Sequence, residues 1–261
     1  MPHNLKEIHP FSGQSLYYTG PDVSEGPLPA LFYFCASGHD SLATDPFNQP
    51  VIYLSKYPIR VFSMTLPFHG PGFDNKQAVG RWADAISRGS DLLNPFLKEV
   101  LDNIDYLLKH NIILEGALAA AGLSRGGLIA THLAARSPHI KAIAAFAPLT
   151  DLFYLDEFQP MRDNALVKAM NLQHVVEQLI GKSLRYYIGN RDMRVGTDAC
   201  FAFIHALVEA SYTNRVRSPA VELIIAPSIG HQGHGTSQHT FNSGARWILS
   251  VLGITNHHEE P

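Results

Sequence analysis

Gly122-Leu123-Ser124-Arg125-Gly126 stands between a run of small apolar residues and a run with helical character. Upstream, residues 116–121 predict a buried strand, and residues 127–136 predict a helix that ends before Pro138. The five residues match G-x-S-x-G, a pattern typical of a tight turn that lifts a serine out of a sheet. Glycines are needed because strand and helix approach too closely there for Cβ atoms. Ser124 is therefore a candidate nucleophile, and the alternative is a serine that merely caps a helix.

Length and composition indicate one ordinary globular domain over residues 1–261. The chain has 261 residues, of which 46% are hydrophobic and 16% charged, enough for a single α/β core. A net charge of −3 gives no electrostatic reason to expect nucleic acid or an anionic membrane as a partner. No apolar run predicts a membrane span, and the N-terminal residues lack a signal segment, so we expect a cytoplasmic protein. Cys35 and Cys200 are too few for a disulfide framework, so both are expected to be reduced and buried.

Apolar strand-like runs recur along the chain, and helical patterns separate most of them. Such repeated strand–helix units predict a mostly parallel, doubly wound α/β sheet of about eight strands with helices on both faces. The first two runs flank Ser-Gly-Gln at 12–14 and predict an antiparallel N-terminal hairpin. Residues 256–261 are expected to form a frayed tail. The predicted strands cover residues 7–11, 16–19, 31–36, 59–64, 116–121, 142–147, 184–188 and 221–226.

With these motifs the chain resembles the α/β-hydrolase superfamily over nearly its whole length. The similarity is greatest to compact serine esterases and to the catalytic domains of prolyl-oligopeptidase-like or dienelactone-hydrolase-like enzymes. The resemblance implies a nucleophile, an acid and a histidine in that order, each on a loop that follows a strand. It implies no cofactor and no metal. The sequence also lacks a Gly-rich dinucleotide motif or a phosphate-binding loop that would suggest a nucleotide fold.

Asp192 is the candidate acid because it closely follows the strand predicted at 184–188, after Gly189. In the family an aspartate at this place orients the histidine and stabilises the imidazolium. A turn-forming aspartate is the alternative interpretation. Asp198 is a weaker candidate, because it falls in the first turn of the next helix, where the helix dipole alone favours a carboxylate.

The histidine is ambiguous, because His231 and His234 both follow the last predicted strand in a Gly-rich stretch. The family usually has a proline and then Gly-His after this strand, which favours His231 and leaves His234 as the alternative. A zinc site of His231, His234 and His239 is a further possibility. The glycines argue against a helix-borne pair of ligands, and no carboxylate is near in sequence.

Two backbone N–H groups are expected to stabilise the negative oxygen that forms during acyl transfer. One is that of Arg125, the residue after the candidate nucleophile. The resemblance implies that the second comes from Ser37, on the loop after the strand at 31–36. Relatives often carry His-Gly where this chain has Cys35-Ala36, and this departure leaves the backbone donor in place.

Residues 150–182 form the one sizeable insertion and are expected to build a small cap. Its residues Phe153, Tyr154 and Phe158, together with Phe68 from an earlier loop, are expected to line a modest apolar pocket. Covering the edge of the sheet is an equally good role for the three cap residues. Four charged residues are candidates for binding a charged end of the substrate: Arg125, Asp156, Glu157 and Arg162.

Three functional classes follow from these observations. The leading one is a serine hydrolase that cleaves small to medium carboxylic esters as small-molecule substrates. A peptidase is the next, since the resemblance includes such enzymes, although the chain leaves no room for the propeller that restricts substrate size in them. The third is a non-catalytic binding protein that keeps the hydrolase fold. The oligomeric state is not predicted by the sequence.

Overall fold

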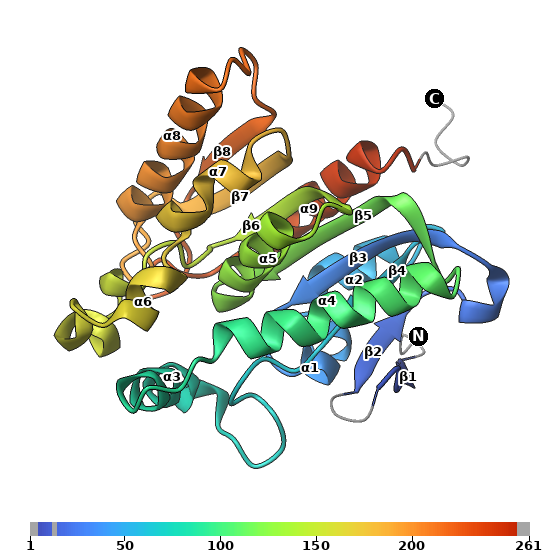
Figure 1. Cartoon of the computed structure of the whole chain (residues 1–261), viewed down its shortest axis with the longest axis horizontal. Coiled ribbons are helices and arrows are strands. Elements are labelled where there is room, and N and C mark those ends of the chain that lie inside the picture. The colour runs from blue at the N-terminus through green and yellow to red at the C-terminus, as the bar shows by residue number, and fades with distance from the viewer. Residues whose placement is uncertain (1–4, 12–14, 255–261) are drawn as a thin grey trace.

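The computed structural model describes residues 5–11 and 15–254, which are built around a central sheet. Eight strands of these residues lie in the order β1-β2-β4-β3-β5-β6-β7-β8 (Figure 1). β2 pairs antiparallel with both β1 and β4, and all the other neighbouring strands are parallel. The strands are β1 (Lys6–Ile8), β2 (Leu16–Thr19), β3 (Leu28–Phe34), β4 (Arg60–Ser63), β5 (Ile113–Leu123), β6 (Ile140–Phe146), β7 (Ser183–Gly189) and β8 (Val221–Ala226).

The predicted fold class is confirmed by this topology. A mostly parallel sheet with an antiparallel N-terminal pair is the arrangement that the alternating pattern indicates. The residues expected to turn the hairpin, 12–14, lie outside the described part of the chain, as does the tail predicted at 256–261.

Helices and short 3-10 segments connect the strands. The α-helices are α1 (Gly38–Ala43), α2 (Gln49–Leu54), α3 (Ala78–Ser87), α4 (Leu93–Lys109), α5 (Arg125–Arg136), α6 (Ala165–Met170), α7 (Val176–Leu179), α8 (Thr197–Thr213) and α9 (Gln238–Val251). The 3-10 segments are η1 (Val23–Glu25), η2 (Asn75–Gln77), η3 (Leu152–Tyr154), η4 (Asp156–Met161) and η5 (Leu172–Val175).

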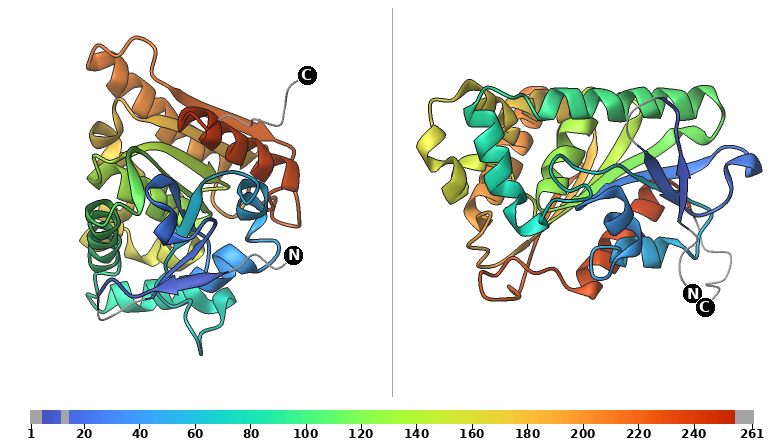
Figure 2. Two further views of the ribbon diagram at one scale, coloured as in Figure 1. Left: turned by 90° about the vertical axis from the view of Figure 1, so that its right-hand side faces the viewer. Right: turned by 90° about the horizontal axis from the view of Figure 1, so that it is seen from below.

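Helices cover both faces of the sheet, so the apolar side chains form two cores (Figure 2). Helices α3, α4, α5, α7 and α8 contribute to one core, and α1, α2 and α9 to the other. Along β3, Phe32 and Phe34 belong to the first core, whereas Leu31 and Tyr33 belong to the second. Successive side chains of a strand point to opposite faces, so burial on both faces explains the unbroken apolar run in the sequence.

The central strand β5 is built from small residues where α5 packs on it. Ala119, Ala120 and Ala121 are fully buried, and their short side chains let the covering helices approach the sheet. α5 begins directly after β5 and contacts both β5 and β6. The loops after the parallel strands meet at the carboxyl edge of the sheet, which is where open α/β sheets bind ligands.

The 150–182 segment is a series of short helical pieces, of which α6 lies beyond that edge and α7 lies back against α5 and α8 (Figure 1). It consists of η3, η4, α6, η5 and α7, and η4 contacts α3 from an earlier part of the chain. Phe158 is fully buried in the first core. The segment is therefore anchored to the body of the molecule, and its action as a cap stays a prediction.

Two further expectations concern cysteines and membranes. Cys35 and Cys200 are both buried with free thiols, as predicted. Among residues 5–11 and 15–254, no helix combines the length and the apolar character needed to cross a bilayer.

Candidate active site

The turn between β5 and α5 holds Ser124 in an unusual backbone conformation. Its φ is 56° and its ψ is −116°, in a region that L-residues with a side chain seldom adopt. The Ser124 amide donates to the carbonyl of Phe146 at 2.9 Å, and the Ser124 carbonyl accepts from the amide of Leu149 at 3.1 Å. Bonds to the end of β6 and to the loop after it thus hold the strained residue in place at the carboxyl edge.

Two glycines make this tight turn possible. A Cβ built on Gly122 would lie 2.1 Å from the backbone of Gly126, and one built on Gly126 would lie 1.8 Å from the carbonyl oxygen of Phe34. Both distances are far below van der Waals contact, so no other residue fits without moving β3 or α5. This is the steric reason for the G-x-S-x-G pattern in the sequence.

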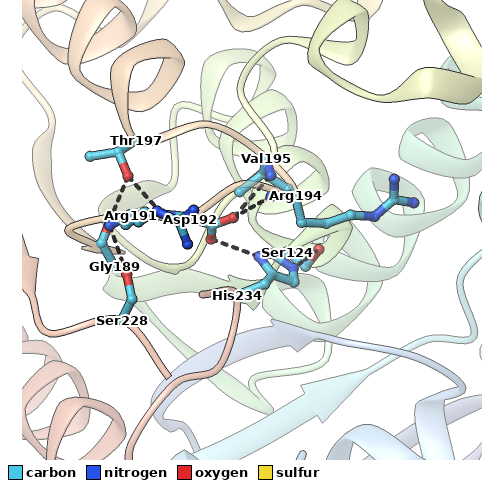
Figure 3. Close-up of polar contacts among 9 residues, drawn as sticks. All are labelled: Ser124, Gly189, Arg191, Asp192, Arg194, Val195, Thr197, Ser228 and His234. Carbon is cyan, nitrogen blue, oxygen red and sulfur yellow. Dashed lines mark hydrogen bonds and ion pairs between the residues drawn. The ribbon is translucent and has the colours of Figure 1, made fainter. Parts of the chain in front are cut away.

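Asp192 lies on the loop after β7, with only 2% of its surface exposed. Its Oδ1 accepts hydrogen bonds from the amides of Arg194 at 2.9 Å and Val195 at 3.0 Å. The Asp192 amide donates to the hydroxyl of Thr197 at 3.0 Å, and this hydroxyl in turn donates to the carbonyl of Gly189 (Figure 3). These bonds fix the carboxylate and leave Oδ2 available for another partner.

That partner is His234, on the loop after β8 (Figure 3). Its Nδ1 lies 2.7 Å from Asp192 Oδ2, and its Nε2 lies 3.0 Å from Ser124 Oγ. A carboxylate only accepts hydrogen bonds, so Nδ1 carries the proton and Nε2 accepts from the serine hydroxyl. Three side chains from three loops thus form one continuous hydrogen-bonded series.

The preference for His231 over His234 is wrong in this structure. Positive φ angles at Gly230 (81°) and Gly233 (71°) fold the loop back, and the amide of Gly235 donates to the carbonyl of Ile229 at 2.9 Å. This closure leaves His231 exposed at the tip of the loop. Gly233 approaches the sheet-edge loop so closely that its Cβ would lie 2.0 Å from the carbonyl oxygen of Arg191. The next residue, His234, is therefore the one whose side chain reaches Ser124.

Asp198 and His239 take no part in this hydrogen-bonded series of side chains. Asp198 is exposed in the first turn of α8. His239 is exposed and lines a cavity of 270 Å³ together with Tyr187, Ile229 and Gly235. Within the described ranges no group of three or more histidine, cysteine, aspartate or glutamate side chains could hold a metal ion. The three histidines of the zinc hypothesis are not brought together.

The two predicted oxyanion donors lie at the start of α5 and on the loop between β3 and α1. Arg125 is the first residue of α5, where an amide has no intrahelical acceptor. Ser37 caps α1, and its Oγ accepts from the amide of Asp40 at 2.9 Å. The amides of Cys35 and Ala36 both donate to Ser41 Oγ at 3.1 Å. In the described chain the Ser37 amide has no such acceptor, so it is free to donate.

The predicted pocket residues differ in their surroundings. Phe158 is fully buried, so its expected place in the pocket wall is wrong: from η4 of the cap segment it packs into the first core. Tyr154 is 43% exposed, and its ring lies over Gly196. Phe68 lines a cavity of 280 Å³ together with Tyr17 and Pro67.

Several functional contacts could not be read from single residues in the sequence. The amides of Arg194 and Val195 hold Asp192, and Ser41 Oγ occupies the amides next to Ser37. The signal for the first was present, because an aspartate often bonds the amides two and three residues later in a turn. Nothing in the sequence indicates that the hydroxyl of Ser41, one turn into α1, accepts from the amides next to Ser37.

Comparison with known proteins identifies the family. The model of the prolyl oligopeptidase family matches residues 81–255, which include Ser124, Asp192 and His234. No curated protein sequence matches the chain.

Similar solved structures agree on the fold. A Thermus thermophilus protein, TT1662, has a TM-score of 0.71 and 17% identity over 97% of this chain and 99% of its own. A Pyrococcus furiosus esterase has a TM-score of 0.62 and 14% identity over 95% and 91% of the two chains. A putative dipeptidyl aminopeptidase IV from Bacteroides ovatus has a TM-score of 0.68 and 17% identity over 96% of this chain. This chain spans 35% of the length of that peptidase, so such similarity shows the fold alone.

A strained serine between β5 and α5, on an eight-stranded hydrolase sheet, lies inside the segment that the family model matches. The chain is a serine hydrolase with the α/β-hydrolase fold and belongs to the prolyl oligopeptidase family.

Proposed function

We propose that the protein hydrolyses small to medium carboxylic esters, with Ser124 as nucleophile, His234 as general base and Asp192 as the carboxylate that orients it. One observation carries the proposal: hydrogen bonds run without a break from Ser124 Oγ through the imidazole to a buried carboxylate. The Asp192 carboxylate fixes the ring tautomer and stabilises the imidazolium that forms.

In the acylation half, His234 Nε2 removes the proton from Ser124 Oγ as this oxygen attacks the ester carbonyl carbon. The carbonyl π electrons move onto its oxygen, which accepts hydrogen bonds from the amides of Arg125 and Ser37. Each such donor contributes about 3 kcal/mol to the stability of the transition state. The imidazolium then gives its proton to the alkoxy oxygen, the C–O bond breaks, and the alcohol leaves an acyl-enzyme behind.

In the deacylation half, His234 removes a proton from water, and the water oxygen attacks the acyl carbon. The second tetrahedral intermediate collapses as its bond to Ser124 Oγ breaks, and the imidazolium returns the proton to the serine. One ester and one water thus give one acid and one alcohol, and the enzyme is restored.

The same constellation also cleaves amides, so a peptidase is the second candidate. The family match and the similarity to a dipeptidyl aminopeptidase favour it. The esterase that matches 91% of its own length favours the first candidate. Rates on a series of p-nitrophenyl esters and on aminoacyl p-nitroanilides separate the two, and faster amide cleavage would replace the ester proposal.

Replacing the nucleophile tests the proposal most simply. We expect Ser124→Ala to lose about 10⁴- to 10⁶-fold in kcat on p-nitrophenyl acetate while its circular dichroism and melting stay close to wild type. Wild type should react with a fluorophosphonate probe, and the variant should not. A wild-type protein that neither turns over the ester nor takes the label would instead be a non-catalytic binding protein.

A further inference from the structure

Arg125 follows the nucleophile in the chain, and its charged side chain makes no ion pair in the described residues. Its Nη1 is buried and has no hydrogen-bond partner in the described part of the chain, and no ion pair joins it to a carboxylate there. Burial of an unpaired charge lowers the stability of the folded protein, and a leucine or glutamine at this position would not carry that cost. Local packing therefore does not explain why an arginine stands at position 125.

The groups around the guanidinium show where it lies. It interacts electrostatically with Cys35 at the end of β3, with Glu157 in η4 and with Arg194 after Asp192. It also acts on His69, on the loop after β4. These four residues come from the loops and the cap segment at the carboxyl edge, where Ser124 lies, so the charge of Arg125 acts at that edge and not in the body of the sheet.

Charge around Arg125 is unbalanced. Glu157 is engaged by Arg194, whose two guanidinium nitrogens donate to its carboxylate oxygens at 2.9 and 3.1 Å. Burial raises the pKa of the Cys35 thiol to about 12 and lowers the pKa of His69 to about 4, so both are neutral at pH 7. Burial also lowers the pKa of Arg125, to about 10, which leaves it protonated. Asp40 also acts on Cys35 and His69, but its carboxylate accepts from Thr44 and lies beside His39, so the described residues leave Arg125 without an ion-pair partner.

His69 does not compensate for that charge. It is 3% exposed, and its Nδ1 lies 2.8 Å from the carbonyl of Pro67, so Nδ1 holds the proton of the neutral ring. Its Nε2 is buried and unpartnered in the described residues. The ring offers a lone pair and no charge, so attraction of an anion is left to Arg125.

We propose that Arg125 binds a carboxylate of the substrate, so that the natural esters carry a free carboxylate a few bonds from the ester carbonyl, as monoesters of dicarboxylic acids do. A guanidinium matches a carboxylate with two parallel hydrogen bonds, and a water-poor wall strengthens the pair. This inference rests on the proposed function, since it names the substrate class of the same site. It also ranks Arg125 above Arg162, which is exposed and bonds Gln159 on the cap segment.

The test compares two esters of equal size and different charge. Monoethyl glutarate carries a carboxylate where its amide counterpart, ethyl 4-carbamoylbutanoate, is neutral. We expect wild type to hydrolyse the charged ester with a kcat/KM about tenfold or more above that of the amide. In Arg125→Gln this ratio should fall about 10- to 100-fold, because a bond to a charged group is lost. The substitution keeps the Arg125 backbone N–H in place.

Matched variants sharpen the result. Arg162→Gln removes a nearby exposed charge and should leave the ratio unchanged, and Arg125→Lys should keep part of the preference. A wild-type ratio at or below one, or an unchanged ratio in Arg125→Gln, overturns the inference. If Arg125→Gln does not fold, the wild-type ratio and Arg125→Lys decide. Failure of the proposed function looks different, because p-nitrophenyl acetate turnover would then be absent or would survive Ser124→Ala.

Discussion

The turn at 122–126 and the loop at 229–235 both bring a side chain to the carboxyl edge, and close contacts require glycine at two positions of the turn but at only some positions of the loop. In the turn, a Cβ on Gly126 would lie 1.8 Å from the carbonyl oxygen of Phe34. In the loop, a Cβ on Gly230 would meet nothing within 4 Å, although its φ is 81°. Contact with the sheet dictates residue identity in the first region. In the second, contact dictates the residue at Gly233, whose Cβ would lie 2.0 Å from the carbonyl oxygen of Arg191, whereas at Gly230 the backbone conformation alone limits the choice.

The largest expected effect comes from adding one methyl group to the turn. Gly126→Ala should destabilise the protein by more than about 4 kcal/mol, because β3 or α5 must move, and ester turnover should be lost as Ser124 is displaced. Denaturant unfolding with the p-nitrophenyl acetate assay measures both.

Gly230→Ala is the matched control in the loop. Its methyl group enters open space, so the cost is the backbone strain alone, about 1 to 3 kcal/mol. Equal losses of stability in the two variants would contradict the contrast between the regions.

Most of the fold can be predicted from the sequence, because a buried strand appears there as a continuous run of apolar residues. β3, β5 and β6 are buried on both faces, so their runs of small and branched apolar residues mark them as strands. The glycines of the turn can be recognised because they lie where two elements that are adjacent in the chain, β5 and α5, come into close contact. Ser124 and Asp192, each close behind its strand, could be found for the same reason.

The histidine and the pocket could not be read in this way, because their positions depend on contacts between distant segments. His234 reaches Ser124 since Gly233 packs on Arg191, forty-two residues earlier in the chain. The apolar character of Phe158 predicts burial, and it does not say whether the burial is in a pocket or in the core. The unpaired charge of Arg125 becomes visible only when its neighbours are in place.

A smaller effect concerns the stability of the protein in acid. His69, on the loop after β4, and His132, in α5, are buried, and burial lowers the pKa of each to about 4. In the unfolded chain their pKa is about 6.5. The neutral rings thus contribute stability that is fully present above pH 6.5 and is lost as the pH falls toward 4, by about 3 kcal/mol for each ring at most.

His132→Gln isolates one of these contributions. The ring Nε2 lies 2.7 Å from the carbonyl of Met170, and a glutamine amide supplies a donor without an ionisable group. We expect the loss of unfolding free energy between pH 7 and pH 4.5 to shrink by about 2 kcal/mol relative to wild type. His205→Gln, at an exposed position of α8, should leave the loss unchanged. An equal reduction in both variants would contradict the assignment to the buried ring.

Turnover of p-nitrophenyl acetate by His234→Ala and His231→Ala tests the central claim most directly. His234 bridges Ser124 and Asp192, whereas His231 is exposed at the loop tip. We expect kcat to fall about 10⁴- to 10⁶-fold in His234→Ala and to stay within about threefold of wild type in His231→Ala. Activity that survives the loss of His234 and disappears with His231 would contradict the account.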